Sequence, residues 1–85
     1  MRFTKDNRQQ VLDGNEGFTA DTYFEGRNYR ESRTYTISGG NLIVKVSGKT
    51  SWADSHYSSE YIYGADDEET KRFLRKYRDE LDLYE

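Results

Sequence analysis

The stretch SGKTSWADSH, residues 47–56, brings together residue types that serve two kinds of chemistry. Gly48-Lys49-Thr50 is the ending of a phosphate-binding loop, and the Ser, Asp and His side chains of a hydrolase triad follow it. A phosphate-binding loop also needs a glycine five residues before the Gly-Lys pair, because several backbone amides must converge on the phosphates. That position is Ile43, inside a predicted strand. We therefore interpret Gly48-Lys49-Thr50 as a turn after a strand.

The triad residues of this stretch are close in sequence, but catalysis needs them held beside an oxyanion site in a pocket that excludes water. One connection of a small domain offers little of that. Asp54 and His56 alone also supply too few ligands for a metal ion. His56, the only histidine, is predicted to be an exposed residue in a loop or at a strand edge. The sequence thus predicts no catalytic residue, no metal and no cofactor, and favours a binding protein over an enzyme.

The composition predicts one small folded domain, residues 1–85, with a thin core. Leu, Ile, Val and Phe together number only 15, but eight tyrosines and one tryptophan add apolar bulk. The formal net charge of −3 is small, unlike that of most disordered chains with so few apolar residues. Cysteine is absent, residues 1–10 lack the apolar run of a signal peptide, and no stretch has the apolar length of a membrane span. We expect a cytoplasmic protein without a membrane partner.

The negative charge lies toward the C-terminal end. Residues 1–64 carry eight acidic and eight basic side chains, whereas residues 65–85 carry eight acidic and five basic ones. Neither part is basic, which argues against direct binding of nucleic acid through its phosphates.

The clearest structural signal is RTYTISGGNLIVKV, residues 33–46. Gly39-Gly40 is typical of a two-residue hairpin turn, because both positions need positive φ. Such a turn sets Ile37 opposite Leu42 and sorts the apolar side chains mainly onto one face.

Strands are also predicted before and after this hairpin. Residues 18–29 form the preceding strand and its turn, and a turn at Gly26-Arg27 sets Phe24 opposite Tyr29. The following strand, HYSSEYIYG, places alternate residues on one side: Tyr57, Ser59, Tyr61 and Tyr63.

The segment ADDEETKRFLRKYRDELDLYE, residues 65–85, predicts an amphipathic helix that packs on the sheet. Asp66 and Glu69 suit an acidic capping box at its start. Its apolar stripe is Phe73, Leu74, Tyr77, Leu81 and Tyr84. A shorter helix is predicted over residues 5–12. The predicted fold class is therefore α+β: an antiparallel three- to four-stranded β-meander packed against a C-terminal amphipathic helix, with a short N-terminal helix.

Aromatic and acidic side chains provide the candidate binding surface. Tyr35 and Tyr77, with Tyr23 or Tyr29, are expected inside, and the other tyrosines must lie at the surface. Beside carboxylates, tyrosines suit a partner rich in Arg and Lys. Trp52 either caps the core or is an exposed anchor for a partner. The contacts are predicted to come from the 47–57 loop and the acidic C-terminal helix: Trp52, Asp54, Tyr57, Glu60, Asp79, Glu80 and Asp82.

A β-meander with one helix, the acidic segments DDEE and DELDLYE, and abundant tyrosine give the chain a recognisable build. In this build it resembles the small anti-CRISPR and other anti-defence proteins of phages and mobile elements. That resemblance implies a non-enzymatic inhibitor that blocks a basic, nucleic-acid-binding surface of a host effector, such as a nucleoprotein. The mild net charge departs from strongly acidic DNA mimics, so the resemblance does not extend to phosphate mimicry.

A self-associating structural or adaptor domain of a mobile element is the alternative function. Exposed strand edges in a thin meander can pair between copies, and a homodimer would bury surplus tyrosine.

Overall fold

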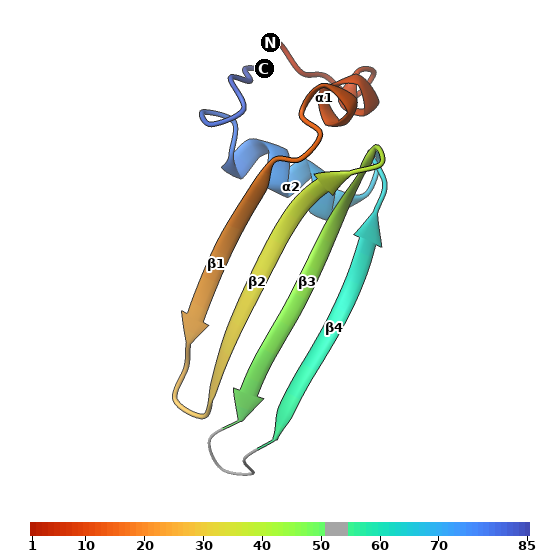
Figure 1. Cartoon of the computed structure of the whole chain (residues 1–85). Coiled ribbons are helices and arrows are strands. Elements are labelled where there is room, and N and C mark those ends of the chain that lie inside the picture. The colour runs from red at the N-terminus through yellow and green to blue at the C-terminus, as the bar shows by residue number, and fades with distance from the viewer. Residues whose placement is uncertain (51–54) are drawn as a thin grey trace.

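The computed structural model describes residues 1–50 and 55–85. Its elements follow the order α1 (Arg8–Gly14), β1 (Thr19–Glu25), β2 (Tyr29–Ser38), β3 (Asn41–Thr50), β4 (His56–Tyr63) and α2 (Glu68–Lys76). The strands form one antiparallel sheet in the order β1-β2-β3-β4 (Figure 1). The predicted α+β meander with a short N-terminal helix and a C-terminal helix is confirmed.

The β2–β3 hairpin has the predicted turn and register. Gly39 and Gly40 have φ values of 61° and 76°, the left-handed region that glycine adopts without a Cβ clash. Ile37 lies opposite Leu42 and Tyr35 opposite Val44. The two faces of the hairpin are therefore those that the sequence predicts.

The β1–β2 turn differs from the prediction. The Gly26 amide donates to the Tyr29 carbonyl at 2.8 Å, so Arg27-Asn28 occupies the turn and Phe24 lies opposite Glu31 rather than Tyr29. The shift is an even number of residues, which leaves every β1 side chain on its predicted face. The Phe24 and Tyr29 rings still meet diagonally, with centroids 5.3 Å apart.

The third strand is longer than predicted. Gly48-Lys49-Thr50 continues β3 instead of forming a turn, and its residues pair with β2 and, at Gly48 and Lys49, with β4. His56 is the first residue of β4, an edge strand, where it is exposed as expected. Gly48-Lys49-Thr50, which matches the end of a phosphate-binding loop in sequence, is therefore part of an ordinary strand.

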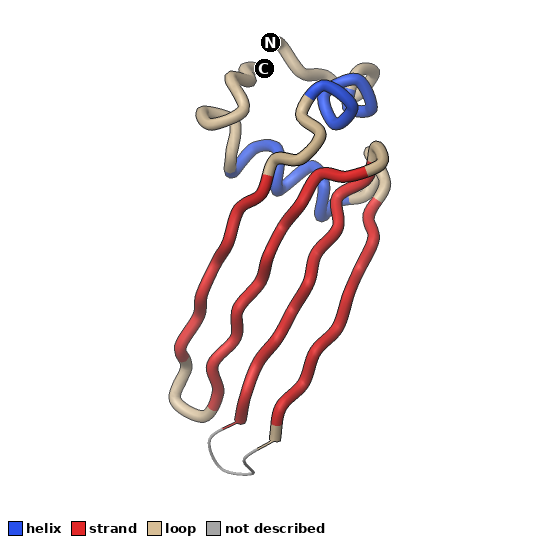
Figure 2. Tube along the Cα trace, viewed as in Figure 1, coloured by secondary structure: helices blue, strands red, loops and turns tan. Residues whose placement is uncertain are grey.

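Both helices lie at one end of the sheet (Figures 1 and 2). The core sits between them and that end, and the Phe73 ring of α2 stacks on Tyr35 of β2 with centroids 5.3 Å apart. The molecule is elongated, 45 × 22 × 20 Å, with a radius of gyration of 14.6 Å against about 12 Å for a compact domain of this length. The buried apolar residues are Phe3, Val11, Leu12, Ile37, Leu42, Val44, Val46, Phe73, Leu74, Leu81 and Leu83.

The start of α2 is built differently from the predicted capping box. Asp67 is the N-cap residue, and its carboxylate accepts from the Gly64 amide at 2.7 Å. Thr70, which is fully buried, donates its hydroxyl to the Gly64 carbonyl at 2.7 Å. Asp66 points to solvent and pairs with Arg8 of α1 at 3.7 Å.

The predicted helix over residues 65–85 is wrong beyond Lys76. Residues 77–82 form turns, and Asp82 has a positive φ of 55°, so the chain reverses there and both Leu81 and Leu83 are buried, which residues two apart in a helix could not be. Tyr84, predicted in the helical stripe, is 60% exposed and forms a parallel bridge with Arg2 instead. The Met1 amine donates to the Asp82 carbonyl, so the two ends of the described chain lie side by side (Figure 1).

None of the eight tyrosines, all in described segments, is fully buried. Tyr35 and Tyr77 are half-buried as predicted, and Tyr63 joins them. Tyr23 and Tyr29 were candidates for the interior, but they are 61% and 41% exposed because their part of the sheet has no helix against it.

Candidate functional site

The sheet extends well past the helices, and we call this far part the open half (Figure 2). It comprises residues 21–33, 45–50 and 56–60. We call the face of the sheet that is continuous with the buried core the core face, and we call the opposite face of the sheet the outer face. Strand registers assign each side chain to one of the two.

The core face of the open half is aromatic. Phe24, Tyr29, Tyr57 and, at its border with the helical end, Tyr61 are 37–54% exposed. We call these four residues the aromatic face. Soluble monomers seldom leave large apolar groups together in water, and where they do the patch commonly marks an interaction site.

A hydrogen-bonded network crosses the aromatic face. Tyr57 lies over Gly48 and donates its hydroxyl to Glu31 at 2.8 Å. Glu31 also accepts a hydrogen bond from the Arg33 guanidinium. Both bonds lower the pKa of the Glu31 carboxyl, and the bond from Arg33 has the larger effect. The bond to Glu31 in turn raises the pKa of Tyr57. A Cβ at position 48 would collide with the Tyr57 ring, so this glycine serves close packing and not phosphate binding.

A second feature, the aromatic hollow, lies where the core face meets α2. It has a volume of about 310 Å³. The Tyr61 and Tyr63 rings line it side by side, with centroids 6.2 Å apart and planes 22° apart. Partial burial raises the pKa of Tyr63, and the nearby Glu69 carboxylate adds to that effect. Its lining residues are Arg33, Tyr35, Val44, Tyr61, Tyr63 and Glu69.

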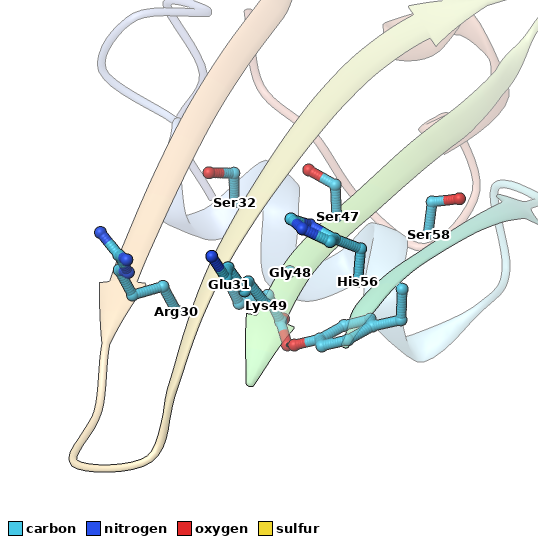
Figure 3. A pocket seen from close by; sticks show the side chains of 9 residues that line it. Arg30, Glu31, Ser32, Ser47, Gly48, Lys49, His56 and Ser58 are labelled. Carbon is cyan, nitrogen blue, oxygen red and sulfur yellow. The ribbon is translucent and has the colours of Figure 1, made fainter. Parts of the chain in front are cut away.

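The outer face of the open half is polar, and two rows of like residues cross it. Arg30, Lys49 and His56 are direct cross-strand partners on β2, β3 and β4. Beside this basic row runs a serine row, Ser32, Ser47 and Ser58, also in direct register. Both rows border a shallow hollow of about 400 Å³, and Figure 3 shows the side chains that line it.

The structure does not bring the predicted contact residues together. Tyr57 is on the core face, whereas Glu60 is on the outer face because strand residues alternate. Asp79 and Glu80 are exposed in the turns after α2, at the other end of the molecule (Figure 1). Trp52 and Asp54 lie outside the described residues.

Asp82, also predicted as a contact, has a local structural role. Its φ of 55° is the only positive value at a non-glycine position in the described ranges. Aspartate tolerates this left-handed conformation better than most residues, and the resulting turn directs Leu83 into the core.

Sequence reasoning missed the aromatic hollow. The alternation in HYSSEYIYG already placed Tyr61 and Tyr63 with Tyr57, but Glu69 joins them only because α2 crosses the sheet at their level. The basic row could not be predicted, because the predicted turn removed Lys49 from the sheet. It follows only from the observed extension of β3 to Thr50.

Residues 1–50 and 55–85 contain no cluster of metal-ligating side chains, no hydrogen-bonded serine–histidine pair and no helix that could span a membrane. In those ranges no group of three or more His, Asp or Glu side chains could hold a metal ion. There His56 forms no hydrogen bond with a serine, as a nucleophile–base pair would require. No helix in the same ranges is long and apolar enough to cross a membrane.

Comparisons with protein-family models, curated proteins and solved structures find no match to this chain. The fold and the site together define a small α+β domain whose sheet projects beyond its core.

Proposed function

We propose that this protein is a non-enzymatic binding domain that occupies a basic surface of another protein. The exposed aromatic face is the observation that carries the proposal. Tyrosine and phenylalanine supply large contact area at little entropic cost, and such residues dominate the energetics of many interfaces.

The aromatic hollow supports a cationic partner. Tyr61 and Tyr63 offer ring faces to an arginine or lysine side chain, and Glu69 offers a carboxylate at the same opening. Arg33, the one cation that lines the hollow, is already paired with Glu31. A guanidinium inserted there would therefore meet two π-faces and one carboxylate, which suits arginine better than lysine.

The proposed mode of action is obstruction, as in the anti-CRISPR proteins that the chain resembles in build. An obstructing domain needs only a complementary surface, and neither the hollow on the outer face nor the aromatic hollow beside α2 is an enclosed cavity. Of the acidic and aromatic residues predicted from the sequence, Tyr57 belongs to this contact surface. Asp79 and Glu80 lie outside it and serve below as the control.

A small probe tests the recognition chemistry. We expect acetyl-arginine methylamide to shift the ring resonances of Tyr61 and Tyr63 in a saturable NMR titration. Acetyl-citrulline methylamide has almost the same shape without the charge and should shift them far less. Equal shifts from the two probes would remove the case for a cationic partner.

A tagged pull-down from the native host tests the function itself. The double variant Tyr61→Ala/Glu69→Gln should lose a partner that the wild type captures, whereas Asp79→Lys/Glu80→Lys should retain it. The captured partner's activity should fall when the wild-type protein is added. If only the Asp79/Glu80 variant loses the partner, the acidic end is the contact surface and the aromatic face is not.

Self-association is the second candidate, favoured by the edge strand β4. All of its residues except Tyr63 are exposed, and Ile62 is 62% exposed. An open edge of this length can pair with a second copy. Sedimentation at micromolar concentration distinguishes the two functions, because a monomer at every concentration rules out assembly.

A further inference from the structure

A basic pocket lies at the helical end, where the two ends of the described chain lie side by side (Figure 1). It has a volume of about 240 Å³ and shares no lining residue with the two hollows described above. Five of its eight lining residues are arginine or lysine and one is glutamate, an excess opposite in sign to the net charge of −3 of the chain. The lining residues are Arg2, Phe3, Thr4, Lys5, Arg8, Lys71, Arg75 and Glu85.

Arg8 and Lys71 are the most buried cations of this pocket. The Arg8 side chain is only 15% exposed, yet it forms no hydrogen bond within residues 1–50 and 55–85. Its ion-pair partner, Asp66, is 3.7 Å away and 94% exposed. Lys71 is 29% exposed, forms no hydrogen bond in the same ranges, and pairs with Glu68 at 3.6 Å. Such exposed, long ion pairs contribute little, whereas a charge withdrawn from water needs hydrogen bonds.

The other three cations differ in how far they are paired. Arg2 and Lys5 have no side-chain partner in the part of the chain that the structure describes. Arg75 donates to the carboxylate of Glu85 at 3.1 Å, and that carboxylate also lines the pocket. When every ion pair is counted, five cations face three carboxylates, which leaves a surplus of two positive charges.

The segment before α1 is held in place by its own contacts. The Asn7 side chain accepts from the Thr4 amide at 2.7 Å and donates to the Arg2 carbonyl at 2.8 Å. Asn7 is the N-cap residue of α1, but its side chain makes these bonds instead of capping the helix. Phe3 is buried, and its amide donates to the Tyr84 carbonyl at 2.8 Å. A backbone held in this way reduces the entropy that is lost when a ligand orders the side chains it carries.

We propose that the basic pocket binds a phosphate monoester. Its cations come from the segment before α1, from α1 and from α2, so they surround a ligand from several sides. A phosphate monoester carries a charge of about −1.5 to −2 at pH 7 and has three acceptor oxygens, whereas a carboxylate has one charge and two oxygens in one plane. Arginine suits such a group because its planar fork donates two hydrogen bonds to one phosphate.

The acidic residues around the pocket limit the size of the ligand. Glu85 occupies the side of the pocket next to Arg75, so a phosphate would compete with it for that guanidinium. Asp66 and Glu68 lie just outside the lining and would repel a longer polyanion. One phosphate group on a small carrier therefore fits better than a nucleic-acid strand. The pocket is at the opposite end of the molecule from the open half, so it does not depend on the proposed protein contact.

An NMR titration with glycerol phosphate, at constant ionic strength, tests the site. We expect saturable shifts of the backbone amides of residues 2–5 and 71–75. Glycerate, which carries a carboxylate in place of the phosphate, should bind at least about tenfold more weakly. Acetyl-phosphoserine methylamide presents the phosphate on a peptide, and the tighter of the two phosphate probes identifies the kind of carrier.

Four variants test the residues. Lys5→Gln and Arg8→Gln should each weaken glycerol phosphate binding about fivefold or more, because each removes a charge-assisted hydrogen bond. Arg8→Lys keeps the charge and should weaken binding less than Arg8→Gln. Arg72 is also on α2, but it pairs with Glu69 and lies outside the lining, so Arg72→Gln should leave the affinity within about twofold. A fifth variant, Glu85→Gln, should instead strengthen binding, because it removes the competing carboxylate.

Any of four results would overturn the proposal. One is no saturable shift with either phosphate probe, and another is glycerate binding as tightly as glycerol phosphate. The third is equal weakening by Arg72→Gln and Lys5→Gln, because the attraction would then be that of a diffuse positive field. The fourth is weaker binding by Glu85→Gln. Amide NMR spectra verify that each variant is folded, and Lys5, which is exposed, keeps the test decisive even if Arg8→Gln unfolds.

Discussion

The two ends of this sheet have the same backbone pairing but different environments. At the helical end, Ile37, Leu42 and Leu74 are fully buried. At the open half, the same strands carry serines, charged residues and exposed rings, yet the cross-strand register continues to Thr50 of β3. The comparison shows that backbone hydrogen bonds can extend a sheet past its core, although they do not by themselves supply the free energy of folding.

Different interactions must therefore stabilise each end. Hydrophobic burial stabilises the helical end, where α2 and the segment after it cover the core face. The open half depends on exposed side-chain contacts such as the hydrogen bond that Tyr57 of β4 donates across Gly48 to Glu31 of β2. A region held in this way keeps its side chains accessible, which a binding surface requires.

The largest expected effect is the loss of a core side chain at the helical end. Leu74→Ala should lower the free energy of unfolding by about 2–5 kcal/mol, because it removes apolar contacts and leaves a cavity. Tyr23→Ala, which truncates an exposed ring of the open half, should change it by about 0.5 kcal/mol or less. Urea unfolding measures both, and similar values would show that the two ends do not differ as we describe.

A smaller effect is expected at a buried hydrogen bond. Thr70→Val keeps the shape but leaves the Gly64 carbonyl without its 2.7 Å donor, which should cost about 1–3 kcal/mol. Thr34→Val removes a 2.8 Å bond to Asp21 on the outer face, at the border of the open half. Water can replace that donor, so its cost in urea unfolding should be clearly smaller. The reverse order would contradict the contrast in burial.

Gly48→Ala tests the packing of Tyr57 on the open half. The new Cβ must displace the Tyr57 ring and break its bond to Glu31, while alanine relieves the entropic cost of glycine in a strand. We expect a net stability change within about 1 kcal/mol. The ring should nevertheless move, and an NMR titration should show the pKa of Tyr57 falling back toward that of an ordinary tyrosine. A Tyr57 pKa equal to that of the wild type would mean that the bond survives.

The smallest effect concerns the pH dependence of the same network. The bonds from Arg33 and Tyr57 lower the pKa of Glu31 in the folded state. Its contribution to stability is therefore present above the unfolded-state pKa and is lost as pH falls through the folded-state pKa. Glu31→Gln should be slightly less stable than the wild type at neutral pH, and the difference should vanish in acid. Urea unfolding at neutral and acidic pH measures it, with Glu25→Gln as the matched control on β1. A difference that persists in acid would assign the effect to shape rather than charge.

Several features of the fold were predictable because they depend on local chemistry. Gly39-Gly40 specifies its own turn, and that turn fixes the register of β2 against β3. The predicted β1–β2 turn began one residue too early. Glycine is common in turns, but Gly26 precedes the turn and its amide donates across it to Tyr29. Gly48 was also predicted to be a turn residue. A glycine is present there because a Cβ would collide with the Tyr57 ring.

The site was less predictable because its members come from distant segments. Tyr57 was expected on the binding surface, but its partner Glu31 is 26 residues away and became a neighbour only through the extended β2–β3–β4 register. Asp79, Glu80 and Asp82 were grouped with it on the strength of charge alone. They lie at the opposite end, where Asp82 shapes a turn.

The sequence by itself determined the strand order of the hairpins and which side chains share a face, because alternation and tight turns act over a few residues. Only the tertiary structure decided how much of the core face is covered. A helix over all of residues 65–85 would be about 30 Å long and, laid along a ten-residue strand of about 33 Å, could cover most of it. Burial of Leu81 and Leu83 instead requires the chain to leave the helix, so α2 has nine residues and spans about 14 Å. Because this short helix crosses the strands at one end of the sheet (Figure 1), it leaves the aromatic face exposed.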